Sequence, residues 1–225
     1  MIYGNSGLVR MRLEKVDGVG PWVWATKDIS AWDGPKHDWE SSHKHFICDL
    51  IPESERNVVV QAGGNMGMYP RLLSDIFKAV YTFEPDSFNF HCLVANCQRE
   101  NIIKMNVALG FDRQLVSIQN SWPDWEINYG TRSVTPLKNS IIPTLSIDDL
   151  GLNECSLIML DVEGYELNVL KGAVNTLEKF KPIVFAEFGD SCIPYMEAFG
   201  YIPKYKSAND MIFVDKTKEY NVQLT

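Results

Sequence analysis

The chain lacks a long apolar segment, a basic excess and a paired-cysteine motif, and each absence excludes a class of protein. No apolar run approaches the roughly 20 residues that are needed to span a bilayer, so the sequence predicts no membrane span. The formal net charge of -8 argues against binding to duplex nucleic acid, because a duplex-binding protein needs a basic face. Residues 1–5 lack the basic and apolar regions of a signal peptide.

The five cysteines form no C-x-x-C pair and no spacing that is typical of metal ligands. Cys92 and Cys97 fall in a predicted helix, where thiols usually act as small core hydrophobes. Free thiols are typical of a reducing compartment, so we expect a cytoplasmic protein.

The first 56 residues differ in composition from the rest of the chain. They hold four of the six tryptophans and three of the four histidines. We interpret residues 1–56 as an N-terminal aromatic arm or cap. Residues 57–225 then form one domain, since a chain of 225 residues fits a single domain with a sizeable core. His37, His43 and His45 have no i, i+4 spacing, so we expect surface residues rather than metal ligands.

From residue 57 onward, apolar strands alternate with amphipathic helices. The order predicts a Rossmann-like three-layer α/β sandwich, with a mostly parallel seven-stranded sheet and an antiparallel edge pair. A stretch at about 120–140 interrupts this order as an irregular insert, and inserts of this length are usually functional or disordered. Strands are predicted at 58–60, 79–84, 102–109, 115–118, 156–160, 182–186, 201–202 and 211–214. Helices are predicted at 68–76, 87–100 with Ser87 as N-cap, 167–177 with a break near Gly172, and 193–199.

A glycine-rich turn follows the first of these strands, and an acid follows the second. Gly63 and Gly67 lie in the turn, and Glu84 comes about 20 residues later, which is the spacing of a nucleotide-binding βαβ unit. Asp161 and Glu187 end two further strands. Ligands of open parallel sheets bind outside the carboxyl ends of the strands, so we expect these residues to gather at one site.

Several longer motifs carry a family resemblance over about residues 57–190. They are VVQAGGNMG at 59–67, FEPD at 83–86, NVALG at 106–110, TLSIDDL at 144–150, LDVEGYE at 160–166 and LKGA at 170–173. The first three resemble class I methyltransferases that use S-adenosyl-L-methionine. The later three are similar to the FkbM-type branch, whose members are mostly O-methyltransferases that act on hydroxyls of sugars and other secondary metabolites.

The resemblance implies a role for individual residues. The loop residues would lie beside the methionine part of the cofactor, Glu84 would bind the ribose hydroxyls, and Asp161 would face the methyl-transfer centre. The residues at 106–108 would lie near the adenine. The full predicted cofactor set is Gln61, Ala62, Gly63, Asn65, Gly67, Glu84, Asn106, Val107, Ala108 and Asp161.

Gln61 departs from the family pattern, which usually has an acid at the end of the first strand. Glutamine accepts a hydrogen bond but adds no charge, and charge-assisted hydrogen bonds are roughly twice as strong as neutral ones. We therefore expect either weaker cofactor binding or a negative charge supplied by Asp161.

Methyl transfer to a hydroxyl requires a group that takes the proton, and a general base contributes roughly 10²–10⁴-fold. The candidates are Asp161 first and Glu187 second. Glu163 is a third candidate, but we favour a capping role for it at a helix that would begin at Gly164. Three carboxylates near one pocket would also suit a magnesium ion, which we do not favour from the sequence.

The tryptophans outside the predicted core offer flat faces for a sugar ring. Trp122 and Trp125 in the insert are the predicted substrate contacts, with Arg132 as partner for an acidic group. No NPPY-like or DPPY-like run follows Asp161, which argues against methylation of an exocyclic amine.

The sequence therefore predicts an S-adenosyl-L-methionine-dependent O-methyltransferase whose acceptor is a carbohydrate or another small hydroxyl compound. Two alternatives stay open: an oxidoreductase that uses a nicotinamide dinucleotide, and a non-catalytic binding protein on a methyltransferase fold. The acceptor and the oligomeric state are not determined by the sequence.

Overall fold

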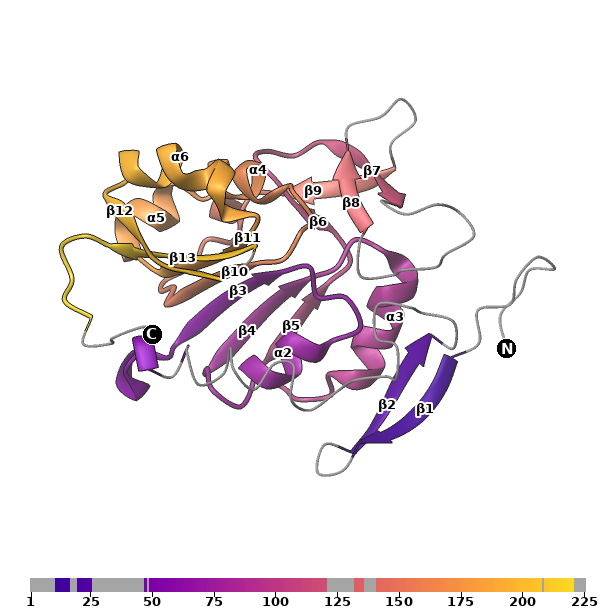
Figure 1. Ribbon diagram of the computed structural model, residues 1–225. Coiled ribbons are helices and arrows are strands. Elements are labelled where there is room, and N and C mark those ends of the chain that lie inside the picture. The colour runs from indigo at the N-terminus through magenta and orange to yellow at the C-terminus, as the bar shows by residue number, and fades with distance from the viewer. Residues whose placement is uncertain are drawn as a thin grey trace.

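A seven-stranded sheet forms the centre of the molecule in the computed structural model, which describes residues 11–16, 20–25, 47, 49–120, 132–135, 141–207 and 209–220 (Figure 1). The strand order is β12-β13-β11-β10-β3-β4-β5. The bounds are β3 Val58–Ala62, β4 Ala79–Phe83, β5 Ile102–Met105, β10 Leu157–Leu160, β11 Ile183–Glu187, β12 Tyr201–Ser207 and β13 Asp210–Asp215.

The sheet is parallel except at one edge. Strands β11, β10, β3, β4 and β5 pair in parallel, whereas β13 is antiparallel to both β11 and β12. All residues of β3 and β10 are buried, as expected for strands that are covered on both faces. The predicted fold class, including the antiparallel edge pair, is confirmed.

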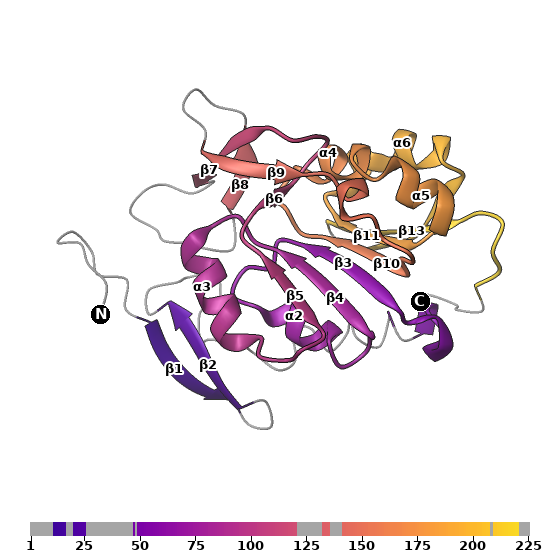
Figure 2. The same ribbon diagram turned by 180° about the vertical axis from the view of Figure 1, so that it is seen from behind.

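Helices cover both faces of the sheet, which gives the three layers (Figures 1 and 2). The bounds are α2 Met68–Leu73, α3 Ser87–Asn96, α4 Glu166–Lys171, α5 Val174–Phe180 and α6 Ile193–Ala198. Alternate strand residues face opposite layers: Val60 packs in one hydrophobic cluster with residues of α4 to α6, and Val59 in the other with residues of α2 and α3. The helix predicted at 167–177 is indeed divided near Gly172, into α4 and α5. A Cβ at Gly172 would lie 2.1 Å from the carbonyl oxygen of Gly110, so this position requires glycine.

Asp86, not Ser87, caps α3. The Asp86 carboxylate accepts hydrogen bonds from the backbone N–H groups of Phe88 and Asn89, at 3.0 and 2.9 Å. The prediction of Ser87 as N-cap was therefore wrong by one residue, and the helix ends at Asn96 instead of continuing to residue 100.

A small four-stranded sheet includes parts of the strand predicted at 102–109 and of the insert predicted at about 120–140. Its order is β6-β9-β7-β8, with β6 Ala108–Leu109, β7 Leu115–Asn120, β8 Arg132–Thr135 and β9 Ile142–Leu145. The single strand predicted at 102–109 was wrong, because Asn106 turns the chain: its side-chain amide donates to the carbonyl oxygens of Glu84 and Pro85, at 2.7 and 3.2 Å.

The predicted irregular insert was wrong for residues 132–135, which pair antiparallel with β7. In that pairing Val134 lies opposite Ile118, so an apolar pair stabilises the ladder. The other residues of 121–140 lie outside the described part of the chain.

An N-terminal hairpin of β1 (Met11–Val16) and β2 (Gly20–Ala25) packs against α3. The backbone N–H of Val23 donates to the side-chain oxygen of Asn96 at 2.7 Å, and the Asn96 amide donates back to the Val23 carbonyl at 2.9 Å. Trp22 is buried, with the Arg71 guanidinium 4.6 Å from its ring centre. The division into arm and domain stays a prediction, and His37, His43 and His45 lie outside the described residues.

The four described cysteines, Cys92, Cys97, Cys155 and Cys192, are free and buried. Within the described ranges, no helix has the length and apolar character needed to cross a membrane.

Candidate active site

The glycine loop after β3 is pressed against the end of β10. Gly63 has a φ of +81°, and a Cβ there would lie 1.7 Å from the carbonyl oxygen of Asp161. The backbone N–H groups of Gly63 and Gly64 both donate to the carbonyl of Phe83, at 3.0 Å each. Only glycine satisfies both the left-handed backbone and this close approach, so the turn brings the ends of three neighbouring strands together.

The buried side chain of Gln61 forms hydrogen bonds with the backbone of this loop. Its side chain is fully buried, and its amide nitrogen donates to the carbonyl oxygens of Ala62 and Gly63, at 3.2 and 2.9 Å. Its amide oxygen accepts from the Thr82 hydroxyl at 2.6 Å. The two carbonyl partners need an N–H donor, which an ionised carboxylate does not have. The glutamine at this position is therefore matched to the loop, and its effect on cofactor affinity stays a prediction.

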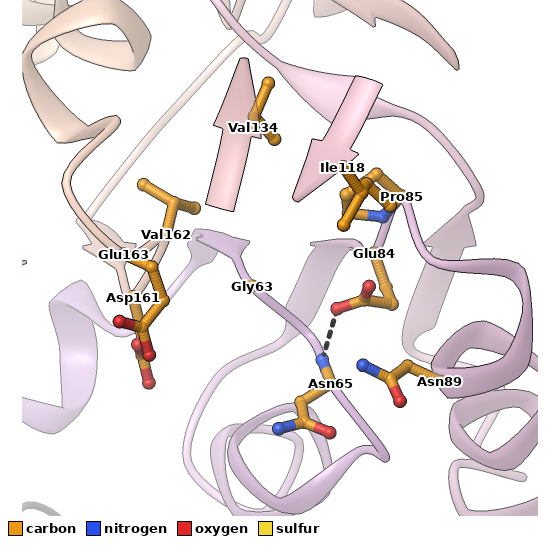
Figure 3. Close-up of a pocket in the computed structure, with 10 residues that line it drawn as sticks. All are labelled: Gly63, Asn65, Glu84, Pro85, Asn89, Ile118, Val134, Asp161, Val162 and Glu163. Carbon is orange, nitrogen blue, oxygen red and sulfur yellow. Dashed lines mark hydrogen bonds between the residues drawn. The ribbon is translucent and has the colours of Figure 1, made fainter. Parts of the chain in front are cut away.

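Glu84 lies across the loop with both carboxylate oxygens engaged by the backbone. One oxygen accepts from the N–H of Asn65 at 2.7 Å (Figure 3). The other accepts from the N–H of Asp86 at 2.8 Å. Asn65 adopts a φ of +45°, and its side-chain oxygen is buried without a hydrogen-bond partner among the described residues. We call residues 63–67 together with Glu84 the loop side of the site.

Three carboxylates face the loop side from the ends of β10 and β11. Asp161 directly follows β10, Glu163 lies two residues further at a φ of +55°, and Glu187 ends β11. One carboxylate oxygen from each residue lies within 4.8 Å of the other two. We call Asp161, Glu163 and Glu187 the acidic side of the site.

A fourth acid, Glu166, lies behind the acidic side. It is fully buried, and one of its oxygens accepts from the backbone N–H groups of Val162 and Gly164, at 3.2 Å each. Helix α4 begins at Glu166, so the capping role predicted for Glu163 was wrong, and Glu166 receives these N–H groups instead. The other Glu166 oxygen is buried and has no hydrogen-bond partner in the described part of the chain.

Burial and mutual repulsion shift the protonation of this cluster. The pKa of Asp161 is raised well above its usual value, first by burial and then by the nearby carboxyl group of Glu187. Burial, with the charges of Glu187 and Glu166, raises the pKa of Glu163 to about 7. The pKa of Glu166 is also raised, chiefly by burial. Burial and mutual repulsion therefore disfavour the ionised forms of these neighbouring carboxyl groups.

A pocket lies between the two sides (Figure 3). Its walls come from the loop side, the acidic side, the first turn of α3 and the β7–β8 hairpin. The lining residues are Gly63, Asn65, Glu84, Pro85, Asn89, Ile118, Val134, Asp161, Val162 and Glu163. Pro85 and Ile118 lie beside Glu84, Val162 lies beside Asp161 and Glu163, and Val134 lies between these two groups (Figure 3).

The structure gathers part of the predicted site. Five predicted residues line the pocket, namely Gly63, Asn65, Glu84, Asp161 and Glu163, and Glu187 joins them through the carboxylate cluster. The others do not line it: Gln61 and Ala62 are buried behind the loop, Gly67 precedes α2, and Asn106, Val107 and Ala108 lie beyond Glu84. Trp122 and Trp125 lie outside the described residues, and Arg132 is described only as backbone at the start of β8.

Sequence reasoning missed five lining residues, Pro85, Asn89, Ile118, Val134 and Val162, and the buried acid Glu166. Pro85 and Asn89 follow Glu84 closely and were within reach of the motif, whereas Ile118 and Val134 meet only through the unexpected β7–β8 pairing. The signal for Glu166 was an acid five residues after Asp161 inside the same motif.

The sheet order, the glycine loop after β3 and the acids after β4, β10 and β11 define a Rossmann-like domain of methyltransferase type. A sequence model described as the methyltransferase FkbM domain matches residues 62–212, which is more than half of the chain. The chain belongs to the FkbM methyltransferase family, as the resemblance predicted.

The chain is similar in sequence to one curated protein and in fold to one crystal structure. The chain is 29% identical over 143 residues to the hexuronic acid methyltransferase AglP of Haloferax volcanii, a match that covers 60% of this chain and 58% of that protein. The chain thus spans little more than half the length of this curated relative. A crystal structure of the methyltransferase FkbM from Methylobacillus flagellatus KT superimposes with a TM-score of 0.52 and 17% identity, over 76% of this chain and 50% of that one.

Proposed function

We propose that this domain transfers a methyl group from S-adenosyl-L-methionine to a hydroxyl of a carbohydrate. The observation that carries the proposal is the arrangement of one pocket between two different walls. Glu84 lies on the loop side, and Asp161 with Glu187 lies on the acidic side, at the carboxyl ends of neighbouring parallel strands. Ligands of such sheets bind at this edge.

The residues of the loop side fit the cofactor. Glu84 lines the pocket, and an ionised carboxylate is a hydrogen-bond acceptor that suits the ribose hydroxyls. The apolar surfaces of Pro85 and Ile118 suit a flat base. Gly63 allows the backbone to approach the ligand without a side chain in the way.

When bound, S-adenosyl-L-methionine supplies a methyl group whose bond to sulfur breaks as the bond to the acceptor oxygen forms. The chain's own contribution is to hold the acceptor in line and to remove its proton. Asp161 and Glu187 are the proposed proton acceptors, because their carboxyl groups adjoin each other and a raised pKa makes the ionised form of Asp161 a stronger base. The apolar side chains of Ile118 and Val134 limit the access of water from the hairpin side.

A carbohydrate acceptor is favoured by the relative rather than by a contact in the pocket. AglP is named for hexuronic acid, and it is 29% identical to this chain over 143 residues. Trp122, Trp125 and Arg132 stay the proposed substrate contacts. A cytoplasmic location also stays part of the proposal.

Thermal unfolding with and without S-adenosylhomocysteine tests the cofactor half of the proposal. A ligand at a hundred times its Kd stabilises the folded state by about 2.7 kcal/mol, so a clear rise in Tm is expected. NAD at the same concentration serves as the control and should leave Tm unchanged. Stabilisation by NAD alone would favour an oxidoreductase instead.

Transfer of a labelled methyl group tests the reaction. We expect label in glycans that contain hexuronic acid or in related sugars, and none after the acceptor hydroxyls have been blocked. Binding of S-adenosylhomocysteine without transfer to any hydroxyl acceptor would support a non-catalytic binding protein.

A further inference from the structure

The acidic side has the geometry of a cation site. Its three carboxylates come from two strand ends, and one oxygen of each lies within 4.8 Å of the others. Three oxygens spaced evenly around one ion lie roughly 3.6 Å apart around Mg²⁺ and roughly 4.2 Å apart around Ca²⁺, from the usual metal–oxygen distances. The limit of 4.8 Å is not far above these values, so small side-chain movements would bring the three oxygens around a single divalent ion.

Buried oxygen atoms without partners point to a missing positive ligand. Glu166 is fully buried, and its second oxygen has no hydrogen-bond partner among the described residues. Its first oxygen binds the backbone of the segment that joins Asp161 to Glu163, which places its carboxylate against the acidic side. One oxygen of Glu187 is likewise buried without a partner. Buried acceptors that lack a hydrogen bond are costly, and carboxylates in this state are usually paired or coordinate a metal.

Charge balance leads to the same conclusion. In the part of the chain that the structure describes, no ion pair reaches Asp161, Glu163, Glu166 or Glu187. The methyl donor carries one net positive charge, since its sulfonium and amino groups outweigh a single carboxylate. Four neighbouring acids therefore exceed what the cofactor neutralises, unless they hold protons or a further cation.

We propose that Asp161, Glu163 and Glu187 bind one divalent, oxygen-preferring cation of the Mg²⁺ or Ca²⁺ class beside the acceptor. Glu166 is a positioning residue, because it fixes the backbone between two of the ligands and adds negative charge behind them. The sequence alone did not favour a magnesium ion at these three carboxylates. The structure adds Glu166, a buried fourth acid, behind them.

The role of the cation rests on the proposed function. Bound to the acceptor, it lowers the pKa of the hydroxyl, whose proton passes to a carboxylate oxygen that the ion does not engage. The acceptor oxygen then forms its bond to the methyl carbon as the bond from sulfur to that carbon breaks. The chemical class of acceptor that suits this site has two adjacent oxygens, as in a sugar diol or a hydroxy acid. For an acidic sugar, the cation also removes the repulsion between the substrate and the cluster.

Metal titration of the full chain, without cofactor or acceptor, tests the site directly. We expect one Mn²⁺ bound per chain by electron paramagnetic resonance, with displacement by Mg²⁺ or Ca²⁺ in calorimetry. Glu163→Gln and Glu187→Gln should each weaken binding by about tenfold or more, since ligand charge sets affinity in such sites. Glu178→Gln is the matched control, because Glu178 is an exposed acid on α5, and binding should not change.

The outcomes separate this inference from the proposed function. No Mn²⁺, Mg²⁺ or Ca²⁺ binding by the wild type at millimolar metal overturns the site and leaves protonation as the way the acids are neutralised. Binding that survives in both variants, each shown to be folded by its thermal transition, also overturns it. If one variant does not fold, the other and the wild-type titration decide. Stabilisation by S-adenosylhomocysteine in metal-free buffer, with no metal binding, leaves the proposed function standing.

Discussion

The two sides of the pocket use the same kind of residue in opposite ways. On the loop side, Glu84 is buried but receives a backbone N–H on each carboxylate oxygen. On the acidic side, Asp161 and Glu187 lie close together, and burial, followed by the neighbouring Glu187 carboxyl group, raises the pKa of Asp161. A buried carboxylate is stabilised when the fold supplies donors and destabilised when it supplies another carboxylate.

The two sides of the pocket therefore differ in what they need in order to bind a ligand. The loop side is preorganised by the backbone, so it can receive a neutral sugar such as ribose without further change. The acidic side is incomplete by itself and gains from a proton or a cation. Substitutions on the two sides should therefore separate stability from activity.

Gly63→Ala should have the largest effect, because the new Cβ would lie 1.7 Å from the Asp161 carbonyl oxygen at a φ of +81°. We expect loss of the Tm shift with S-adenosylhomocysteine, together with a strong loss of stability. Gly151→Ala is the control, since Gly151 also has a positive φ but nothing within 4 Å of its Cβ position. That variant should lose only about 1–2 kcal/mol of unfolding free energy, measured by denaturant titration. Equal losses in both variants would contradict a role for the close contact.

Asp161→Asn should lower the rate of methyl transfer by roughly 10²–10⁴-fold, the usual contribution of a general base. Its Tm should stay the same or rise, because the substitution removes a charge that the fold disfavours. Asp148→Asn should show the reverse pattern. The Asp148 carboxylate accepts from the N–H groups of Asn175 and Thr176 at the start of α5, so stability should fall while the rate is kept. A loss of Tm in Asp161→Asn would contradict the proposed repulsion.

Gln61→Glu tests whether the family's usual acid would suit this chain better. We expect a loss of about 1–3 kcal/mol in unfolding free energy, because the Gly63 carbonyl would lose its side-chain donor and the Ala62 carbonyl would keep only the N–H of Asp161. The measurement is denaturant unfolding, with Gln98→Glu on the exposed surface as the control. A more stable Gln61→Glu variant would show that the loop adapts to an acid.

Glu84→Gln should destabilise the fold less than Gln61→Glu does. One amide oxygen can still accept a backbone N–H, but the nitrogen on the other side cannot, which costs roughly 1 kcal/mol. We expect about tenfold weaker binding of S-adenosylhomocysteine, measured by calorimetry, since a charge-assisted bond to the ribose is lost. Unchanged affinity would place the ribose elsewhere.

Much of the fold followed from periodicity. Parallel strands that are buried on both faces have continuous apolar runs, and β3 and β10 are of this kind. Because their carboxyl ends meet at one edge, the neighbourhood of Gly63, Glu84 and Asp161 could be predicted from local patterns alone.

The missed features depend on contacts between distant segments. Glu166 was given no role, because an acid in the first turn of a helix is usually solvated, and its burial depends on how the segment after Asp161 folds over it. Gln61 was recognised as a departure, but its two carbonyl partners depend on the path of the loop. The β7–β8 pairing joins segments on either side of an irregular stretch, which no short-range pattern indicates.

A structure of the complex with S-adenosylhomocysteine tests the central claim most directly. The account predicts ribose hydroxyls within hydrogen-bond distance of Glu84, and a sulfur atom whose open side faces Asp161 and Glu187. Ligand bound elsewhere on the chain, or in this pocket with its ribose on the acidic side, would contradict it.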